Sequence, residues 1–221
     1  VDREAGLIRL LTPPLDKAEP SAGYIQAYPK GVRENGGQYS HAGVWALIAQ
    51  AISGDGDAAY RYFKHLSPAH RSAHPDQSGA YEIEPYVMAG DIYSQVPYVG
   101  RGGWSWYTGS AAWMHRAAIE HQFGLRQGDD EISFKPCLPS EWDHAEITLR
   151  RDGRIARFIF CRPGAQATLT NAERAGSNPL AVGQVLRWSD LGPQSSHLLM
   201  LEAPAMSSGM TSVRPENIKA S

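Results

Sequence analysis

Two short polar stretches, each just ahead of an apolar helical pattern, hold the residues of this sequence best suited to bind an anion. The first, residues 35–45 (NGGQYSHAGVW), brings an amide, a phenol, a hydroxyl and an imidazole together. Ser40 can pair with one of the N–H groups that the first turn of a helix leaves free, which predicts an N-cap. The same N–H groups and the helix dipole attract phosphate, so the stretch around His41 also predicts an anion site.

The second stretch, GGWSWYTGSAAW, repeats this arrangement. Thr108 can cap the helix that follows, and Gly109 and Ser110 would expose backbone N–H groups in its first turn. If both helix starts face one pocket, two dipoles act on the same oxyanion. Trp104 and Trp106 stand beside this point, where an indole ring suits the face of a sugar. The repeated pattern therefore predicts phosphate and sugar binding next to each other.

Two further polar groups suit sugar binding. In VRENGG, the adjacent Arg33, Glu34 and Asn35 offer groups that make paired contacts to sugar hydroxyls. An exposed turn with an Arg–Glu pair explains this pattern equally well. Glu82 and Glu84 are two residues apart, so an extended segment would carry both on one face, as the paired carboxylates of glycoside cleavage require. Two acids with this spacing are more often simply exposed to solvent, without a catalytic role.

Two other motifs do not predict a site. His70 and His74 are four residues apart, but the intervening residues lack the Glu of a metalloprotease motif and Pro75 argues against a helix. VGRGGW resembles a dinucleotide fingerprint only loosely, because no strand–helix unit surrounds it. These two motifs therefore predict neither a zinc site nor a dinucleotide site.

The overall composition is that of a globular protein, with 42% hydrophobic and 20% charged residues among 221. The net charge of −2 gives no electrostatic support for a nucleic-acid partner. Cys137 and Cys161 are too few for a disulfide framework, so two free thiols are expected, although a bridge between them stays open. We find no signal peptide and no apolar run long enough to span a membrane. The chain opens on Val1 and GLIRLLTPP, which reads as the end of an element, so we expect a C-terminal piece of a longer polypeptide.

The hydrophobic periodicity predicts helices first and strands afterwards. Helices are expected over 40–53, ended by Gly54, then from a cap at Asp55 or Asp57 to a point before Pro68, over 85–93 and over about 109–123. A polar loop is expected over 67–80. Strands are expected over 131–135, 145–149, 154–161, 167–169 and 198–201, with RRDGR as a hairpin turn. The last dozen residues are expected to be mobile.

Four segments of the sequence resemble glycoside hydrolase family 94, which contains inverting phosphorylases: GYIQAYPKGVRENGGQYSHAGVWALIAQA, YEIEPYVMAGDIY, VGRGGWSWYTGSAAWMHRAAIEHQFGL and ISFKPCLPSEW. The likeness covers about residues 5–160. It is closest to the C-terminal phosphorylase-like region of cyclic β-1,2-glucan synthases. No such likeness extends beyond about residue 163.

The resemblance implies a mainly α fold with a β-rich C-terminal part. Residues 1–126 would supply the closing helices of an (α/α)6 barrel, a partial barrel, and residues 127–221 a β-rich segment. The implied substrates are a β-linked glucan and inorganic phosphate, with no cofactor. The residues implied to bind phosphate are His41, Thr108, Gly109 and Ser110. Those implied to lie near the substrate are Arg33, Glu34, Gln38, Glu84 and Trp106.

The general acid of the family is an Asp on an earlier part of the barrel, and that part of the pattern is absent here. The chain alone is therefore expected to be inactive, and to need the remainder of its polypeptide or a second copy to cover apolar helix faces. By resemblance, it would lie at the cytoplasmic face of a bacterial inner membrane. Two alternatives remain open: a hydrolase on the same barrel with Glu84 as base, and a non-catalytic glucan-binding or assembly module.

Overall fold

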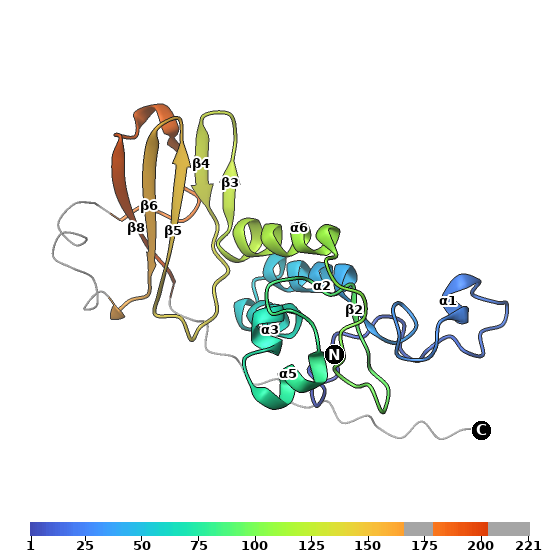
Figure 1. Cartoon of the computed structure of the whole chain (residues 1–221). Helices are drawn as coiled ribbons and strands as arrows, with labels where there is room; N and C mark the ends of the chain where they lie inside the picture. The colour runs from blue at the N-terminus through green and yellow to red at the C-terminus, as the bar shows by residue number, and fades with distance from the viewer. Residues whose placement is uncertain (166–178, 203–221) are drawn as a thin grey trace, which may run out of the picture.

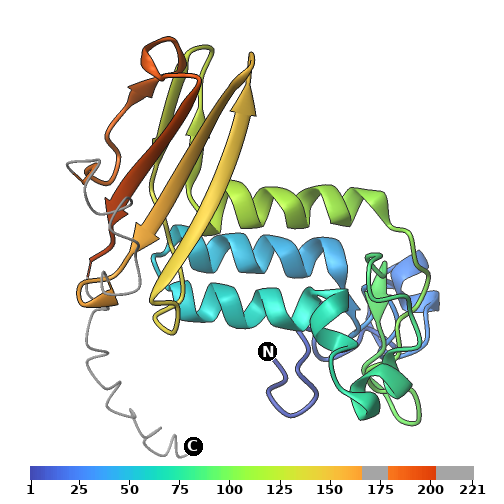
Figure 2. The same ribbon diagram turned by 60° about the vertical axis from the view of Figure 1, so that its left-hand side comes forward.

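The computed structural model describes residues 1–165 and 179–202, and in it the helices and the main sheets occupy different parts of the molecule (Figure 1). The helices α2, α3 and α6 lie side by side, with the larger sheets across one end and loops gathered at the other (Figure 2). The helical elements are α1 (Tyr24–Ala27), α2 (Ser40–Ile52), α3 (Gly56–Leu66), α4 (Pro68–Arg71), α5 (Pro75–Tyr81), α6 (Thr108–Arg116), the π-helix η1 (Ala117–Gln122) and the 3₁₀-helix η3 (Trp188–Asp190).

Within the part of the chain that the structure describes, the strands form three small sheets. The first pairs β1 with β2 antiparallel, the second has the order β3-β4-β7, and the third has the order β5-β6-β8, in which β6 and β8 are parallel. The strand bounds are β1 (Gln38–Tyr39), β2 (Asp91–Ile92), β3 (Leu125–Gln127), β4 (Glu131–Phe134), β5 (His144–Arg151), β6 (Arg154–Cys161), β7 (Leu186–Arg187) and β8 (Gln194–Met200). Helices followed by strands confirm the coarse order that the periodicity predicts.

The predicted helix pair α2–α3 is confirmed, and its packing follows from small residues and caps. One face of α2 is buried through Val44 and Leu47. Gly43 lies against Leu66 of α3, since a Cβ at this position would stand 2.7 Å from a methyl group of that leucine. Asp55 caps α3 by accepting the Ala58 N–H at 2.8 Å.

Two local predictions are wrong. Residues 67–80 are not one polar loop but contain α4 and α5, each with a proline in its first turn, where the missing N–H costs nothing. Residues 85–93 are not a helix, because Asp91 and Ile92 form β2 and pair with β1. This pairing joins parts of the chain that are far apart in sequence, so local periodicity contains no sign of it.

The strands expected over 131–135, 145–149 and 154–161 correspond to β4, β5 and β6, and that over 198–201 falls largely in β8. Asp152 and Gly153 both have positive φ, 50° and 74°, as a type I′ hairpin turn requires. The expected strand over 167–169 and the last dozen residues lie outside the described residues. Cys137 and Cys161 are free thiols, as expected. The predicted boundary at 126/127 remains a prediction; η1 ends at Gln122 and β3 begins at Leu125.

The largest hydrophobic cluster lies between the two three-stranded sheets. Phe134 of β4 and Phe158 of β6 are nearly or fully buried, and their ring centroids are 4.6 Å apart. Trp188 of η3 closes the same cluster. The helices have a separate cluster, built from α2, α6 and their neighbours. The starts of α2 and α6 lie at the opposite end of these helices from the sheets, where the loops gather (Figure 2).

Candidate functional site

The starts of α2 and α6 are held side by side by one short segment of backbone. The N–H of Ser40 donates to the carbonyl of Gly90 at 3.0 Å, and the N–H of Tyr107 donates to the carbonyl of Met88 at 3.0 Å. Because residues 88 and 90 are two positions apart in one chain segment, the two helices begin next to each other. The ring of His41 lies 6.1 Å from the ring of Tyr107, the residue before Thr108.

Neither helix start is capped by a side chain, so the predictions of caps at Ser40 and Thr108 are wrong. Both residues are the first of their helices, and the N-cap positions belong to Tyr39 and Tyr107, which make no side-chain cap hydrogen bond. A phenol oxygen lies too far from its own backbone to reach the first-turn N–H groups. The helix ladder of α6 begins at Ala111, whose N–H donates to the Tyr107 carbonyl at 3.1 Å.

The N–H groups that precede this ladder in α6 belong to Thr108, Gly109 and Ser110. Thr108 is exposed, whereas Ser110 is buried and its hydroxyl donates to the Tyr107 carbonyl at 3.0 Å. The Ser110 side chain therefore stabilises the turn, so the predicted contact of Ser110 with an anion would have to use its backbone N–H. Uncapped donors at two adjacent helix starts, together with the dipoles of both helices, produce a positive potential suited to an oxyanion.

Aromatic rings surround the two helix starts. The hydroxyl groups of Tyr39 and Tyr107 lie 3.1 Å apart and share a hydrogen bond. Burial, followed by this bond, raises the pKa of Tyr39 to about 12, so it stays a neutral hydroxyl. The ring of His41 lies 5.0 Å from that of Trp45 and 5.9 Å from that of Trp113. These contacts limit the rotation of the imidazole at the start of α2.

Arg33 and Glu34 stand on the loop that leads into β1. The Arg33 guanidinium lies between two aromatic faces, 4.7 Å from the ring centroid of Tyr28 and 4.6 Å from that of Trp104. Its Nε lies 3.5 Å from a carboxylate oxygen of Glu34. Arg33 has a φ of 51°, and its backbone N–H donates to Asp91 at 2.6 Å. A cation, an acid and an exposed indole edge are thus grouped beside Tyr39.

The structure places Gln38 differently from the other predicted residues. Its side chain is fully buried, and its amide oxygen accepts the Ile8 N–H at 2.8 Å while its amide nitrogen donates to the His65 carbonyl at 3.2 Å. Both ends of the amide are therefore used to join the N-terminal segment to α3. A role for Gln38 in contact with substrate stays a prediction that these bonds do not favour.

Glu82 and Glu84 do not project from one face of an extended segment. Glu82 has a φ of 54° at the end of α5 and forms an ion pair with Arg101 at 3.1 Å, so the paired-carboxylate arrangement is wrong. Glu84 is half-buried at the turn that leads toward Met88. Trp106 is 63% exposed, and its ring lies 6.3 Å from that of Tyr86, so both aromatic rings reach the surface near the start of α6.

Two polar residues of this region, Tyr107 and Asp91, were not predicted from sequence, and Tyr39 was noted only as the phenol of the first stretch. The two tyrosines each precede a predicted helix start, which was the available signal. Asp91 is 1% exposed and lies in AGDIY, between small and apolar residues. An acid in such a buried context indicates a specific partner, and the partner is the backbone of Arg33.

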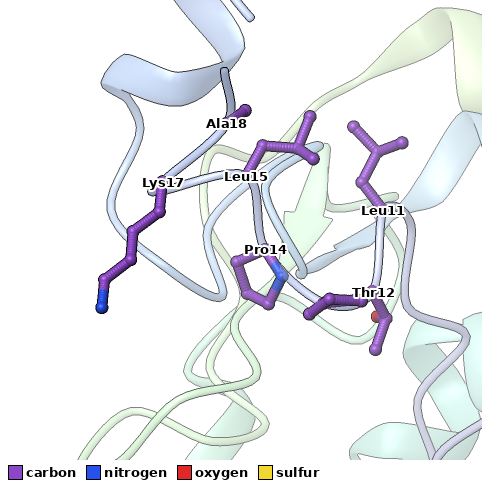
Figure 3. Close-up of a pocket in the computed structure, with 7 residues that line it drawn as sticks. Leu11, Thr12, Pro14, Leu15, Lys17 and Ala18 are labelled. Atoms are coloured by element: carbon purple, nitrogen blue, oxygen red, sulfur yellow. The ribbon is translucent and has the colours of Figure 1, made fainter. Parts of the chain in front are cut away.

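One hollow elsewhere in the chain lacks these features. The hollow of about 400 Å³ within residues 11–18 is lined mainly by apolar side chains, and Lys17 extends away from the leucines there (Figure 3). Within residues 1–165 and 179–202, His, Cys, Asp and Glu side chains form no cluster of three or more that suits a metal ion. In the same ranges no helix has the length and apolar character to cross a membrane.

Comparison with known proteins is consistent with a catalytic domain. Residues 1–124 match the Glycosyl hydrolase 94 superfamily, catalytic domain, and the chain belongs to this family. The chain is 44% identical over 162 residues to cyclic beta-(1,2)-glucan synthase NdvB of Rhizobium meliloti, which aligns 73% of this chain with 6% of that protein.

Two phosphorylases are also similar to the chain. Solabiose phosphorylase of Paenibacillus borealis is 30% identical over 151 residues, which are 68% of this chain and 19% of the enzyme. N,N'-diacetylchitobiose phosphorylase of Vibrio furnissii is 28% identical over 173 residues, 75% of this chain and 21% of the enzyme. The chain thus spans less than a quarter of the length of each relative. It is related to a glucan synthase and to disaccharide phosphorylases.

Proposed function

We propose that this chain is the C-terminal part of an inverting β-glucan phosphorylase domain, which cleaves a β-1,2-glucan or a related β-glucoside with phosphate to give glucose 1-phosphate. One observation carries the proposal: two helices begin side by side, without side-chain caps, with His41 and Thr108 at their starts. This arrangement suits an inorganic oxyanion better than a neutral nucleophile.

In this proposal phosphate takes the place of the water that an inverting hydrolase activates. Phosphate is already a nucleophile at neutral pH, so no carboxylate base is required, and one acid must protonate the leaving oxygen. The backbone N–H groups of Gly109 and Ser110, with the His41 imidazole and the Thr108 hydroxyl, hold the phosphate. They orient it toward the anomeric carbon and reduce the entropic part of the barrier.

The sugar lies beside this phosphate, toward Arg33 and Glu34. Their guanidinium and carboxylate can pair with hydroxyl groups in fixed directions, because Arg33 is already held between Tyr28 and Trp104. Glu84 and the exposed Trp106 are proposed to contact the sugar from the other side. The proposal requires no metal ion and no organic cofactor.

We further propose that the helices belong to the closing part of an (α/α)6 barrel and that the remainder of the polypeptide supplies the general acid. Trp45 and Ile52 on α2 are 54% and 71% exposed, which suits a face that a further helix would cover. Each relative is more than four times the aligned length, which agrees with this proposal. The 221 residues alone are then expected to be inactive, and the likeness to a glucan synthase suggests the cytoplasmic face of a bacterial inner membrane.

The test uses the full-length polypeptide and β-1,2-linked gluco-oligosaccharides. Cleavage should require inorganic phosphate, with release of α-glucose 1-phosphate observed by ³¹P NMR and its anomeric configuration by ¹H NMR. Cleavage to free glucose at the same rate without phosphate would instead identify a hydrolase. Oligosaccharide binding by calorimetry without any cleavage would identify a binding module.

A further inference from the structure

Asp91 is the most deeply buried carboxylate near the candidate site, and its two oxygens are in unequal environments. Oδ2 accepts the Arg33 N–H at 2.6 Å, whereas Oδ1 has no hydrogen-bond partner among the described residues. A buried acid is costly unless its acceptor atoms are used, so a residue of this kind needs a structural reason. The reason lies in the two neighbours that Asp91 joins.

The first neighbour is the backbone of Arg33, which has a φ of 51°, a conformation that is uncommon for a residue with a side chain. The bond from its N–H to Asp91 spans 58 positions of sequence and fixes this conformation. With the backbone held in this way, the guanidinium lies between Tyr28 and Trp104.

The second neighbour is the segment that carries Trp104. The N–H of Gly103 donates to the Asp91 carbonyl at 2.9 Å, and the N–H of Gly90 donates to the Trp104 carbonyl at 2.7 Å. The indole of Trp104 packs against Gly90, where a Cβ would stand 2.0 Å from the ring. At Gly103 a Cβ would stand 1.8 Å from Oδ1 of Asp91. Both glycines are therefore required by close approach.

We infer that Asp91 is a positioning residue, which sets the place of the Arg33 guanidinium against Trp104 and so prepares the cation for the sugar. Asp91 does this from both sides: its side chain holds the arginine backbone, and its main chain holds the segment of the indole. The effect of Asp91 on catalysis rests on the proposed function, whereas its effect on the position of Arg33 does not. Burial raises the pKa of Asp91, whereas the bond from the Arg33 N–H acts in the opposite direction because it stabilises the carboxylate.

The direct test follows the Arg33 Nε–H resonance by NMR in the 221-residue chain, with assignment by Arg33→Lys. Ring currents from Tyr28 and Trp104 should move this resonance upfield. Asp91→Ala should abolish the upfield shift, and Gly103→Ala should do so too, because the added methyl group displaces the intact carboxylate. Asp91→Asn should retain the shift, since an amide oxygen can still accept the Arg33 N–H.

The matched control is Asp57→Ala. Asp57 also accepts a loop N–H, that of Ser140 at 2.6 Å, but it lies at the start of α3, away from the site. This variant should keep the Arg33 shift. An unchanged Arg33 resonance in folded Asp91→Ala or Gly103→Ala would overturn the inference. If Asp91→Ala does not fold, the contrast between Gly103→Ala and Asp91→Asn decides the question.

The catalytic consequence is measured in the full-length polypeptide. Asp91→Ala and Gly103→Ala should raise the KM for the glucan by about 10-fold or more, the effect of one misplaced charged contact, while the KM for phosphate stays within about 2-fold. Asp91→Asn should restore most of the glucan KM. Loss of stability alone would not separate the two KM values. If the wild-type protein cleaves the glucan at the same rate with and without phosphate, the proposed function is refuted. The NMR result would still decide the role of Asp91.

Discussion

The proposal that one phosphate contacts both helix starts can be tested by a double-mutant cycle. The variants are His41→Ala, which removes the imidazole at the start of α2, and Thr108→Val, which removes the hydroxyl at the start of α6 and keeps the shape of the side chain. Both residues lie in the first turns of helices whose backbones are held by residues 88 and 90. Among residues 1–165 and 179–202, neither side chain forms a hydrogen bond that the substitution would remove, so the fold should be retained.

The expected loss of phosphate affinity in each variant follows from the charge of the ligand. A hydrogen bond to a charged group contributes about 1.5–3 kcal/mol, which corresponds to a loss of about 10- to 150-fold in phosphate affinity for each variant. The ring of His41 lies 6.1 Å from that of Tyr107, the residue next to Thr108, so the two side chains would meet the same small ion. Groups that share one ligand couple by about 0.5–3 kcal/mol, so the double variant should lose less than the product of the single losses.

The assay is the phosphate KM of the full-length polypeptide at saturating glucan, together with calorimetric titration by phosphate. His144→Ala and Thr148→Val in β5 are controls of the same residue types outside the site, and both should leave the phosphate KM unchanged. A phosphate KM within 2-fold of wild type in His41→Ala and Thr108→Val would refute the shared site. Full additivity in the double variant would show that the two residues act on different ligands.

Three further predictions concern the stability of the chain. Phe158→Ala should lower the free energy of unfolding in urea by about 3–5 kcal/mol, because Phe158 is fully buried and packs against Phe134. Asp55→Ala should lower it by about 1 kcal/mol through loss of the bond from the Ala58 N–H at the start of α3. Burial lowers the pKa of His197 below its usual 6.5. The contribution of the neutral imidazole to stability should therefore be complete above about pH 6.5 and should be lost as the pH falls through the lower pKa of the folded state. His197→Gln should remove this part of the acid dependence.

A different result would contradict each of these three predictions. An unchanged urea midpoint in Phe158→Ala would mean that the cluster between the sheets is not a close-packed core. For Asp55→Ala, a loss no greater than that of the exposed Ser53→Ala would argue against the cap. For His197, the relevant measurement is the urea midpoint between pH 8 and pH 5. The same decline in wild type and in His197→Gln would assign the acid sensitivity to other groups.

Local features of the chain determine much of the secondary structure. The apolar spacing of α2 and α3, the Asp55 cap and the Asp–Gly turn between β5 and β6 are all short-range properties, and the structure confirms each of them. The same kind of reasoning failed over 85–93, where β2 forms through pairing with β1. That pairing is non-local, and the period of the residues themselves resembled a helix.

The candidate site shows the same division. The sequence indicated His41 and Thr108 from the polar residues at two helix starts, and it indicated Arg33 and Glu34 from their density of hydrogen-bonding groups. It also suggested side-chain caps at Ser40 and Thr108, which are absent because each helix begins one residue after a tyrosine. The sequence did not indicate that the side-chain amide of Gln38 forms hydrogen bonds with the backbone of Ile8 and His65. It also did not indicate that Asp91 accepts the backbone N–H of Arg33.

The sequence by itself therefore determined the types of chemical group, the elements that carry them and the family to which the chain belongs. Only the tertiary structure decided which groups meet. The carbonyls of Met88 and Gly90 bring two helix starts together, and Asp91 fixes an arginine 58 positions away. Hydrogen bonds between distant segments depend on how the chain folds back on itself, and neither local spacing nor residue type encodes that path.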